Sequence, residues 1–142
     1  HQAALACIKP GAVFTDMQDA AVKVITQGLI DIGLLTGELD KNIEDQTYCK
    51  YYMHNIGHWL GMDVHDVGMY KLNGESRPLI AGMVTTVEPG IYIDPDDTDI
   101  AAQWRGIGVR IEDNILVTED GYRNLTANLP VTVADIETLM AS

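Results

Sequence analysis

The sequence predicts an α+β domain with an antiparallel sheet. Residues 1–46 carry apolar side chains at helical spacing, residues 83–126 contain short strand-forming runs divided by turn signals, and residues 132–140 return to a helical pattern. Because helices and strands occupy separate parts of the chain, the strands are expected to pair antiparallel. The length of 142 residues suits a single domain with a real core.

The composition limits which partners the protein can bind and which cellular compartment suits it. The net charge of −12 argues against binding to nucleic acid or to an anionic membrane surface, because both require a basic patch. No apolar run approaches the length of about 18 residues that a membrane span needs, and no signal peptide opens the chain. Cys7 and Cys49 form no C-x-x-C pair. Two free thiols in a reducing, cytoplasmic setting are favoured over one disulfide, which stays an alternative.

The first elements are expected to be helical. Residues 1–9 resemble the end of a helix that stops at Pro10-Gly11, so the chain is expected to begin inside an element and not at a natural N-terminus. The next helix is predicted to begin at Thr15, in a capping box with Gln18. Residues 38–46 are expected to form a second, short helix. The side chains predicted to face the core from the longer helix are Met17, Ala20, Ala21, Val24, Ile25, Gly28, Ile32 and Leu35.

The middle of the chain is predicted to form strands and loops. Residues 48–52 are bulky and aromatic, which favours a strand, and the histidine-rich residues that follow are expected to be a strand or an irregular loop. Residues 67–78 are predicted to be a loop, and residues 83–87 a strand that ends at Glu88 before Pro89-Gly90. Residues 91–93 are a further short strand. The acidic residues 94–99 lack the spacing of an EF-hand and are expected to be a solvated loop.

The clearest strand pattern covers residues 106–118. Apolar side chains at the odd positions alternate with Arg110, Glu112 and other residues at the even positions, which predicts one continuous strand with two distinct faces. Asp120-Gly121 is a turn signal, and residues 122–126 are expected to return as a partner strand. Thr132 is expected to cap a final helix that runs to Met140.

Three motifs carry candidate chemistry. His54, His58 and His65 fall within twelve residues, V-E-P-G occupies residues 87–90, and R-I-E-D occupies residues 110–113. Imidazole is the commonest metal ligand in proteins. Taken singly, each motif has an ordinary structural explanation, such as a core histidine, a solvent-facing glutamate or an exposed ion pair.

Taken together, the motifs predict a metal site. His58, Glu88 and Glu112 would supply one nitrogen and up to four carboxylate oxygens from three separate segments, a mixture that suits Mn²⁺, Co²⁺ or Zn²⁺. Carboxylates can bridge, so the set could hold two ions that activate water and polarise a carbonyl group. The zinc-peptidase motif H-E-x-x-H is absent from the sequence.

Other polar residues of the same motifs would assist the metal site. Arg110 lies on the same strand face as Glu112 and would orient a ligand carboxylate. His54 and His65 would remain free to hydrogen-bond a substrate or to move a proton.

At this point the sequence resembles a known family. H-N-I-G-H-W-L-G-M-D-V-H-D at 54–66, T-V-E-P-G-I-Y at 86–92 and Q-W-R-G-I-G-V-R-I-E-D at 103–113 are similar to motifs of the pita-bread metallopeptidases, and most of all to bacterial Xaa-Pro aminopeptidases (aminopeptidase P). The resemblance runs over nearly the whole chain, through G-Y-R-N-L-T at 121–126 to the last helix. It implies the C-terminal half of a pita-bread fold, an antiparallel curved sheet with helices on its outer face.

The resemblance also implies an activity and residue roles. The family is expected to hold two metal ions, usually Mn²⁺, and to release the N-terminal residue from peptides whose second residue is proline. Carried over by motif, the implied metal ligands are His58, Glu88 and Glu112, the implied catalytic residues are His54, His65, Glu88 and Arg110, and the implied supporting residues are Arg110 and Tyr92.

One departure from the family pattern is expected to matter. The family uses two further aspartate ligands from the preceding half of its fold, and none of the aspartates in the helical region here fits those roles. Residues 1–142 are therefore expected to be the C-terminal part of a catalytic domain, incomplete at the N-terminus and inactive alone. Self-association into a homo-oligomer, or binding of a partner that supplies the missing half, is expected, because half a fold exposes a sheet edge and an apolar face. The alternatives are a prolidase acting on X-Pro dipeptides and a non-catalytic binding protein on the same fold.

Overall fold

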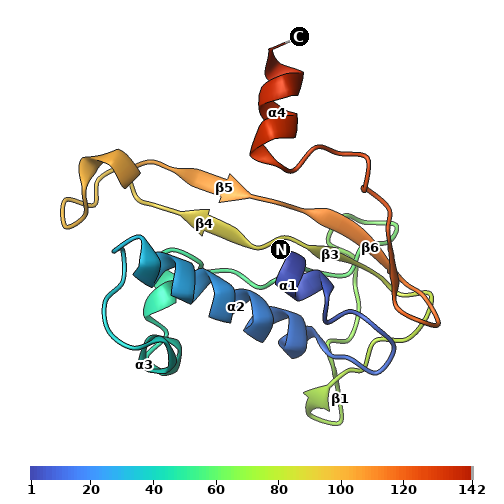
Figure 1. Cartoon of the computed structure of the whole chain (residues 1–142). Helices are drawn as coiled ribbons and strands as arrows, with labels where there is room; N and C mark the ends of the chain where they lie inside the picture. The colour runs from blue at the N-terminus through green and yellow to red at the C-terminus, as the bar shows by residue number, and fades with distance from the viewer. Residues whose placement is uncertain (142) are drawn as a thin grey trace.

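The computed structural model describes residues 1–141 and confirms the α+β class, with the elements in nearly the predicted order (Figure 1). The α-helices are α1 (Gln2–Leu5), α2 (Phe14–Asp31), α3 (Leu39–Glu44) and α4 (Val133–Met140), and two 3₁₀ helices are η1 (Thr47–Lys50) and η2 (Ala102–Trp104). The strands are β1 (Lys71–Leu72), β2 (Glu75–Ser76), β3 (Val84–Val87), β4 (Gly90–Tyr92), β5 (Gly108–Arg110), β6 (Asp113–Val117) and β7 (Tyr122–Asn124).

The strands form one long antiparallel ribbon and a small separate hairpin. β6 lies between β3 and β7, while β4 pairs with β5. Figure 1 shows that β3 leads into β4 and β5 into β6, so the two sheets follow one another along the ribbon, with α1 and α2 along one side. This arrangement agrees with the expected antiparallel sheet that carries helices on one face.

The predicted strand over residues 106–118 is interrupted at residues 111–112. The partner chain is interrupted at the same level, at Glu88 and Pro89, and proline has no N–H to donate to a neighbouring strand. One backbone bond still crosses the gap, from the Ile111 N–H to the Pro89 carbonyl oxygen at 3.3 Å. The break therefore turns one predicted strand into β5 and β6, and it places Glu112 at the junction between them.

Helix α2 starts earlier and buries a slightly different stripe than predicted. Its first turn is closed by the Asp16 carboxylate, which accepts the Val13 N–H at 2.9 Å, so the predicted Thr15–Gln18 capping box is wrong. The predicted inward residues Val24 and Ile32 are 56% and 45% exposed, because the helix turns another line of side chains to the ribbon. The buried residues of α2 are Met17, Ala21, Val22, Thr26 and Leu29.

The predicted strand at residues 48–52 is instead the 3₁₀ helix η1 and the turn after it. Tyr51 and Tyr52 are both buried and Tyr48 is half-buried, a spacing of three and four residues that suits a helical turn and not an alternating strand. Burial raises the pKa of Tyr52 to about 12. The neighbouring Cys49 and the distant Cys7 are both free thiols, as expected.

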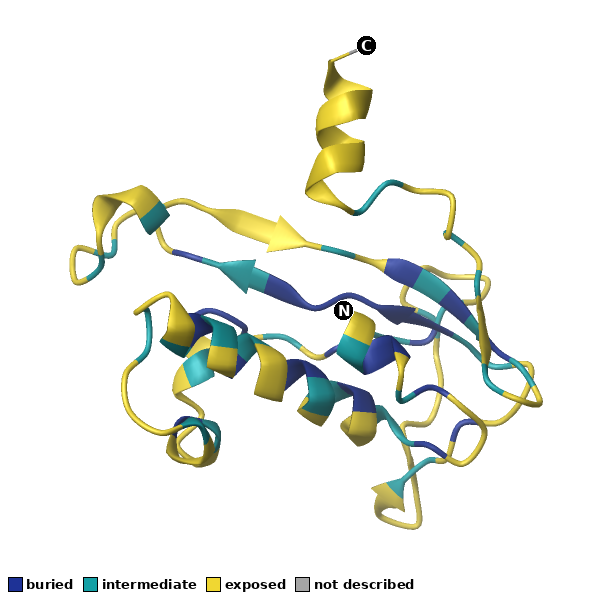
Figure 2. Cartoon of the chain, viewed as in Figure 1, coloured by how far each residue is buried: buried dark blue, intermediate teal, exposed yellow. Residues whose placement is uncertain are grey.

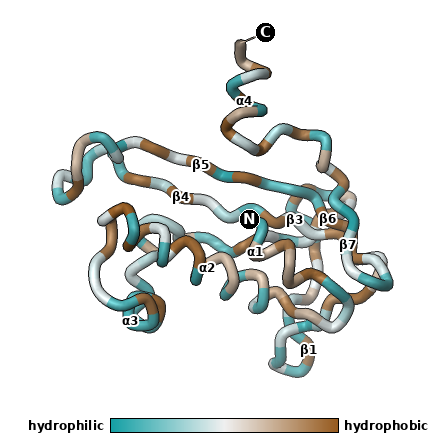
Figure 3. Tube along the Cα trace, viewed as in Figure 1, coloured by the Kyte–Doolittle hydropathy of each residue, from teal (hydrophilic) through white to brown (hydrophobic). Residues whose placement is uncertain are grey.

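One predicted loop carries more order than expected, and a second is confirmed as an exposed loop. Within residues 67–78, β1 and β2 form a hairpin around Asn73-Gly74, a residue pair that favours two-residue turns. The acidic residues 94–99 form the hydrophilic tip of the β4–β5 ribbon (Figure 3), and the Lys50 ammonium lies 2.6 Å from the Asp97 carboxylate there. A hydrogen bond from Lys50 lowers the pKa of Asp97.

The final helix α4 begins at the predicted cap. The Thr132 hydroxyl accepts the Asp135 N–H at 3.1 Å. Figure 2 shows that α4, like β5, is exposed, and α4 stands away from the rest of the chain. Within residues 1–141, no helix combines the length and the apolar character that crossing a membrane requires.

The histidine segment lies against β3 without forming a regular strand. Three backbone bonds run antiparallel between them: Leu60 N–H to the Val84 carbonyl (3.1 Å), Thr86 N–H to the His58 carbonyl (2.9 Å), and Glu88 N–H to the Ile56 carbonyl (2.7 Å). From the far side, the Gln18 side-chain oxygen accepts the Ile56 N–H at 2.6 Å. Residues 56–60 are therefore held between α2 and the ribbon.

Close approach of the two backbones explains Gly57. A Cβ atom at this position would lie 2.1 Å from the Thr86 carbonyl oxygen, a rigid backbone atom. We predict that Gly57→Ala lowers the free energy of unfolding by about 1–3 kcal/mol, as overpacking does elsewhere. Gly28→Ala is the matched control, because nothing lies within 4 Å of its Cβ, and it should stabilise α2 by about 0.5–1 kcal/mol. Urea unfolding of both variants measures this, and equal effects of the two substitutions would contradict the account.

Candidate metal centre

Three adjacent chain segments bring His58, Glu88 and Glu112 together. His58 belongs to the segment beside β3, Glu88 follows β3 directly, and Glu112 precedes β6, which is the other neighbour of β3. One ligand atom from each residue lies within 4.8 Å of the others. This is the only such cluster of histidine, cysteine and carboxylate side chains among the described residues.

The orientation of His58 is set by a backbone carbonyl. Its Nδ1 lies 2.9 Å from the Trp59 carbonyl oxygen. Because a carbonyl can only accept, Nδ1 donates its N–H there, and this bond turns Nε2 toward the cluster. Nε2 lies 3.2 Å from a Glu88 carboxylate oxygen. A histidine that is oriented through one nitrogen, with the other directed at carboxylates, is the usual arrangement of a metal ligand.

Glu88 is buried and is held on both carboxylate oxygens. It is 7% exposed. The Thr86 hydroxyl donates to Oε1 at 2.8 Å, and the Arg110 guanidinium lies 3.4 Å from Oε2. The Thr86 hydroxyl also accepts the His58 N–H at 3.0 Å, so one buried side chain orients both Glu88 and His58. The prediction from sequence did not include Thr86, although it opens the T-V-E-P-G-I-Y motif.

Arg110, Tyr92 and His54 form a chain of hydrogen bonds along the site. The Arg110 Nε–H donates to the Tyr92 hydroxyl at 2.5 Å, and this bond raises the pKa of Arg110. The His54 Nδ1 lies 2.8 Å from the Asn55 carbonyl, so Nδ1 donates there. Nε2 of neutral His54 then accepts from the Tyr92 hydroxyl at 3.1 Å. A Cβ at Gly90 would meet this hydroxyl at 2.5 Å, which explains the glycine.

His65 completes the rim of the site. Its ring meets the His58 ring edge to face, with centroids 4.2 Å apart, although His65 itself is exposed. All the predicted site residues are thus close to the cluster or hydrogen-bonded to residues that are. A cleft of about 360 Å³ opens above it and is lined by His54, Asn55, Gly57, His58, His65, Glu88 and Arg110.

This arrangement provides oxygen and nitrogen donors of the kind that bind divalent metals. It also places the Arg110 guanidinium and the imidazoles of His54 and His65 in the lining of the cleft. The helical aspartates do not join the donor set: Asp16, Asp19 and Asp31 lie on α2, and Asp40 lies on α3.

Comparison with known proteins assigns the chain to a family. The sequence model of metallopeptidase family M24 matches residues 1–119. The chain belongs to metallopeptidase family M24. The predicted resemblance is therefore confirmed over most of the length.

Three relatives illustrate the match. The Xaa-Pro aminopeptidase of Haemophilus influenzae is 52% identical over 137 residues, which are 96% of this chain and 31% of that protein. The structure of Pseudomonas aeruginosa aminopeptidase PepP superposes with a TM-score of 0.96 at 55% identity, covering 99% of this chain and 32% of that one. A zinc-substituted Escherichia coli aminopeptidase P in complex with product gives a TM-score of 0.90 at 42% identity, with coverage of 99% and 31%. The M24 chain thus spans about a third of the length of these relatives, and its fold matches that part of aminopeptidase P.

The hydroxyl of Thr86 gives a direct test of how this M24 site is held. Thr86→Val keeps the shape but leaves the half-buried His58 N–H without its acceptor, so we predict a loss of about 1–3 kcal/mol in the free energy of unfolding. Thr138→Val is the control, because that hydroxyl bonds an exposed carbonyl within α4, and its effect should stay within about 0.5 kcal/mol. Thermal unfolding compares the two, and a Thr86→Val protein as stable as the parent would refute this role.

Proposed function

We propose that residues 1–142 are the C-terminal part of an M24 catalytic domain, and that the complete domain releases the N-terminal residue from peptides with proline in second position. The observation that carries the proposal is the convergence of His58, Glu88 and Glu112 in a chain 52% identical to a Xaa-Pro aminopeptidase. The matched share of about a third of each relative supports placing these residues within a longer catalytic unit.

The donor set fits a divalent metal. Nε2 of His58 and the carboxylates of Glu88 and Glu112 would hold it, with two Mn²⁺ ions as our proposal for the complete site. When bound, such ions activate water and polarise the scissile carbonyl. The zinc-substituted relative supports the divalent class, while the choice of manganese remains part of the proposal.

The side chains around the ligands have distinct roles in the proposed reaction. Glu88 accepts a proton from the attacking water, because its carboxylate lies at the floor of the cleft. The Arg110 guanidinium lies against the Glu88 carboxylate, and Arg110 is itself held by its hydrogen bond to Tyr92, so Arg110 restrains the carboxylate against rotation. His54 and His65 lie at the cleft and hydrogen-bond the peptide, so they orient the substrate and can pass a proton to the leaving group.

Three further parts of the proposal follow from the same features. All three expected ligands are present, which favours an enzyme over a non-catalytic binding protein on this fold. The free thiols of Cys7 and Cys49 favour a reducing compartment, the cytoplasm. Exposed apolar residues on the β4–β5 ribbon, Ile107 (42%) and Val109 (50%), support association between copies.

Metal binding by residues 1–142 tests the ligand assignment. We predict weak Mn²⁺ binding, because three ligands hold an ion less well than the full set. His58→Ala, Glu88→Gln and Glu112→Gln should each lower the affinity at least about tenfold, measured from free Mn²⁺ by electron paramagnetic resonance. Glu75→Gln in the exposed β1–β2 hairpin is the control and should bind as the parent does. Ligand variants that retain full affinity would disprove the site.

Activity tests the substrate assignment. We predict that the longer polypeptide containing these residues, loaded with Mn²⁺, releases the first residue from X-Pro-X tripeptides, and that residues 1–142 alone do not. Chromatography of the products from an X-Pro dipeptide and an X-Pro-X tripeptide separates the two candidate reactions. A clear preference for the dipeptide would establish the prolidase alternative instead, and cleavage of neither peptide would contradict both.

A further inference from the structure

Two consecutive carboxylates stand at the start of β6, and they point in opposite directions. Glu112 is exposed and faces the metal cluster, whereas Asp113 is 4% exposed and faces the interior. Asp113 is the first residue of β6 and Glu112 immediately precedes it, so the direction of the Asp113 side chain constrains that of Glu112. A shift of the chain by one residue at this point would turn the Asp113 carboxylate toward the metal cluster and the Glu112 carboxylate away from it.

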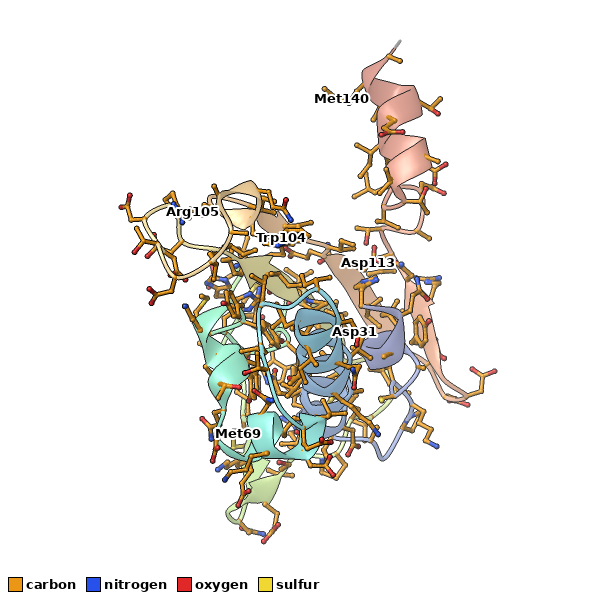
Figure 4. All side chains as sticks on the ribbon, turned by 60° about the vertical axis from the view of Figure 1, so that its left-hand side comes forward. Asp31, Met69, Trp104, Arg105, Asp113 and Met140 are labelled. Atoms are coloured by element: carbon orange, nitrogen blue, oxygen red, sulfur yellow. The ribbon has the colours of Figure 1, made fainter. Side chains whose placement is uncertain are left out.

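Asp113 is held in place by the chain that follows β7. The Thr126 hydroxyl donates to Asp113 Oδ1 at 2.5 Å and accepts the Asn114 N–H at 3.0 Å. On its other oxygen, Asp113 lies 3.2 Å from His1 Nε2. Figure 4 shows Asp113 where β6 passes the N-terminal helix. Both the side chain of Asp113 and the backbone of the next residue are therefore anchored by one threonine.

Thr126 is itself held by a local turn. The Asn124 side-chain oxygen accepts the Thr126 N–H at 2.8 Å, and the Leu125 N–H donates to the Asn114 carbonyl at 2.8 Å. The hydroxyl of Thr126 has a single proton, and it lies closer to Asp113 than to Asn124, at 2.5 Å against 3.1 Å. These contacts give a physical reason for the N-L-T sequence at 124–126, which supplies no metal ligand.

We propose that Thr126 is a positioning residue that selects Glu112, and not Asp113, as the carboxylate presented to the metal. The selection is needed at this point of the chain because residues 111 and 112 lie between β5 and β6, outside both ladders of paired residues. With Asp113 pinned inward through its side chain, Glu112 must leave on the cleft side. This inference rests on the proposed function, since it assigns Glu112 to the metal.

Thr126→Val tests the inference, because it keeps the shape of the side chain and removes only the hydroxyl. Mn²⁺ affinity of residues 1–142 should fall by about 10–100-fold, the usual loss when a partner behind a metal ligand is removed. Thr126→Ser restores the hydroxyl and should recover most of the affinity, which a purely structural role for the methyl group would not produce. A folded Thr126→Val protein that binds Mn²⁺ as tightly as the parent would overturn the proposal.

Two further measurements keep the test decisive. If the parent chain itself binds no Mn²⁺, the metal-site proposal fails. The positioning role is then tested by a crystal structure of Thr126→Val. We expect the Glu112 carboxylate to move away from His58 and Glu88 in that structure. A Glu112 carboxylate that stays in place would reject the role. If Thr126→Val does not fold, Asn124→Ala loosens the same turn and keeps the hydroxyl. A weaker loss of Mn²⁺ affinity is expected for it, and no loss would again reject the role.

Discussion

The antiparallel hydrogen bonds between residues 56–60 and β3 are the constraint on which the site depends. They fix the position of His58 along β3, beside Thr86 and Glu88. The pairing of β3 with β6 then places Glu112 beside the end of β3 that carries Glu88. Neither glutamate has to reach across a flexible loop, because each stands at the end of a paired strand. The close contact of Gly57 with β3 is a consequence of the same pairing.

Hydrogen bonds between side chains then orient the residues that the backbone pairing brings together. Thr86 orients His58 and Glu88 at once, and the Arg110–Tyr92–His54 chain restrains the opposite side of the cleft. The two carboxylates of the cluster lie near one another in a chain of net charge −12, so their repulsion is offset by Arg110 and, in our proposal, by bound cations. The geometry and the charge of the site therefore both point to a divalent ion.

The sequence predicted that His58, Glu88 and Glu112 would lie together, and the structure brings these three side chains together. Their role as metal ligands stays a prediction. Prediction from the sequence failed where tertiary packing overrides local preference. Tyr51 and Tyr52 favour strands, but both are buried by a helical turn. Thr15 and Gln18 match a capping box, but Gln18 instead binds the Ile56 N–H, a partner 38 residues away that no local pattern can indicate. Thr86 and Thr126 were missed for the same reason, since their roles depend on contacts across the sheet.

Anomalous diffraction from a crystal grown with Mn²⁺ tests the central claim most directly. Our account predicts a manganese peak within coordination distance of His58 Nε2 and of the carboxylates of Glu88 and Glu112, with Asp113 still turned inward. A peak that is coordinated by other residues, or a crystal with no peak at this cluster at saturating Mn²⁺, would contradict the account.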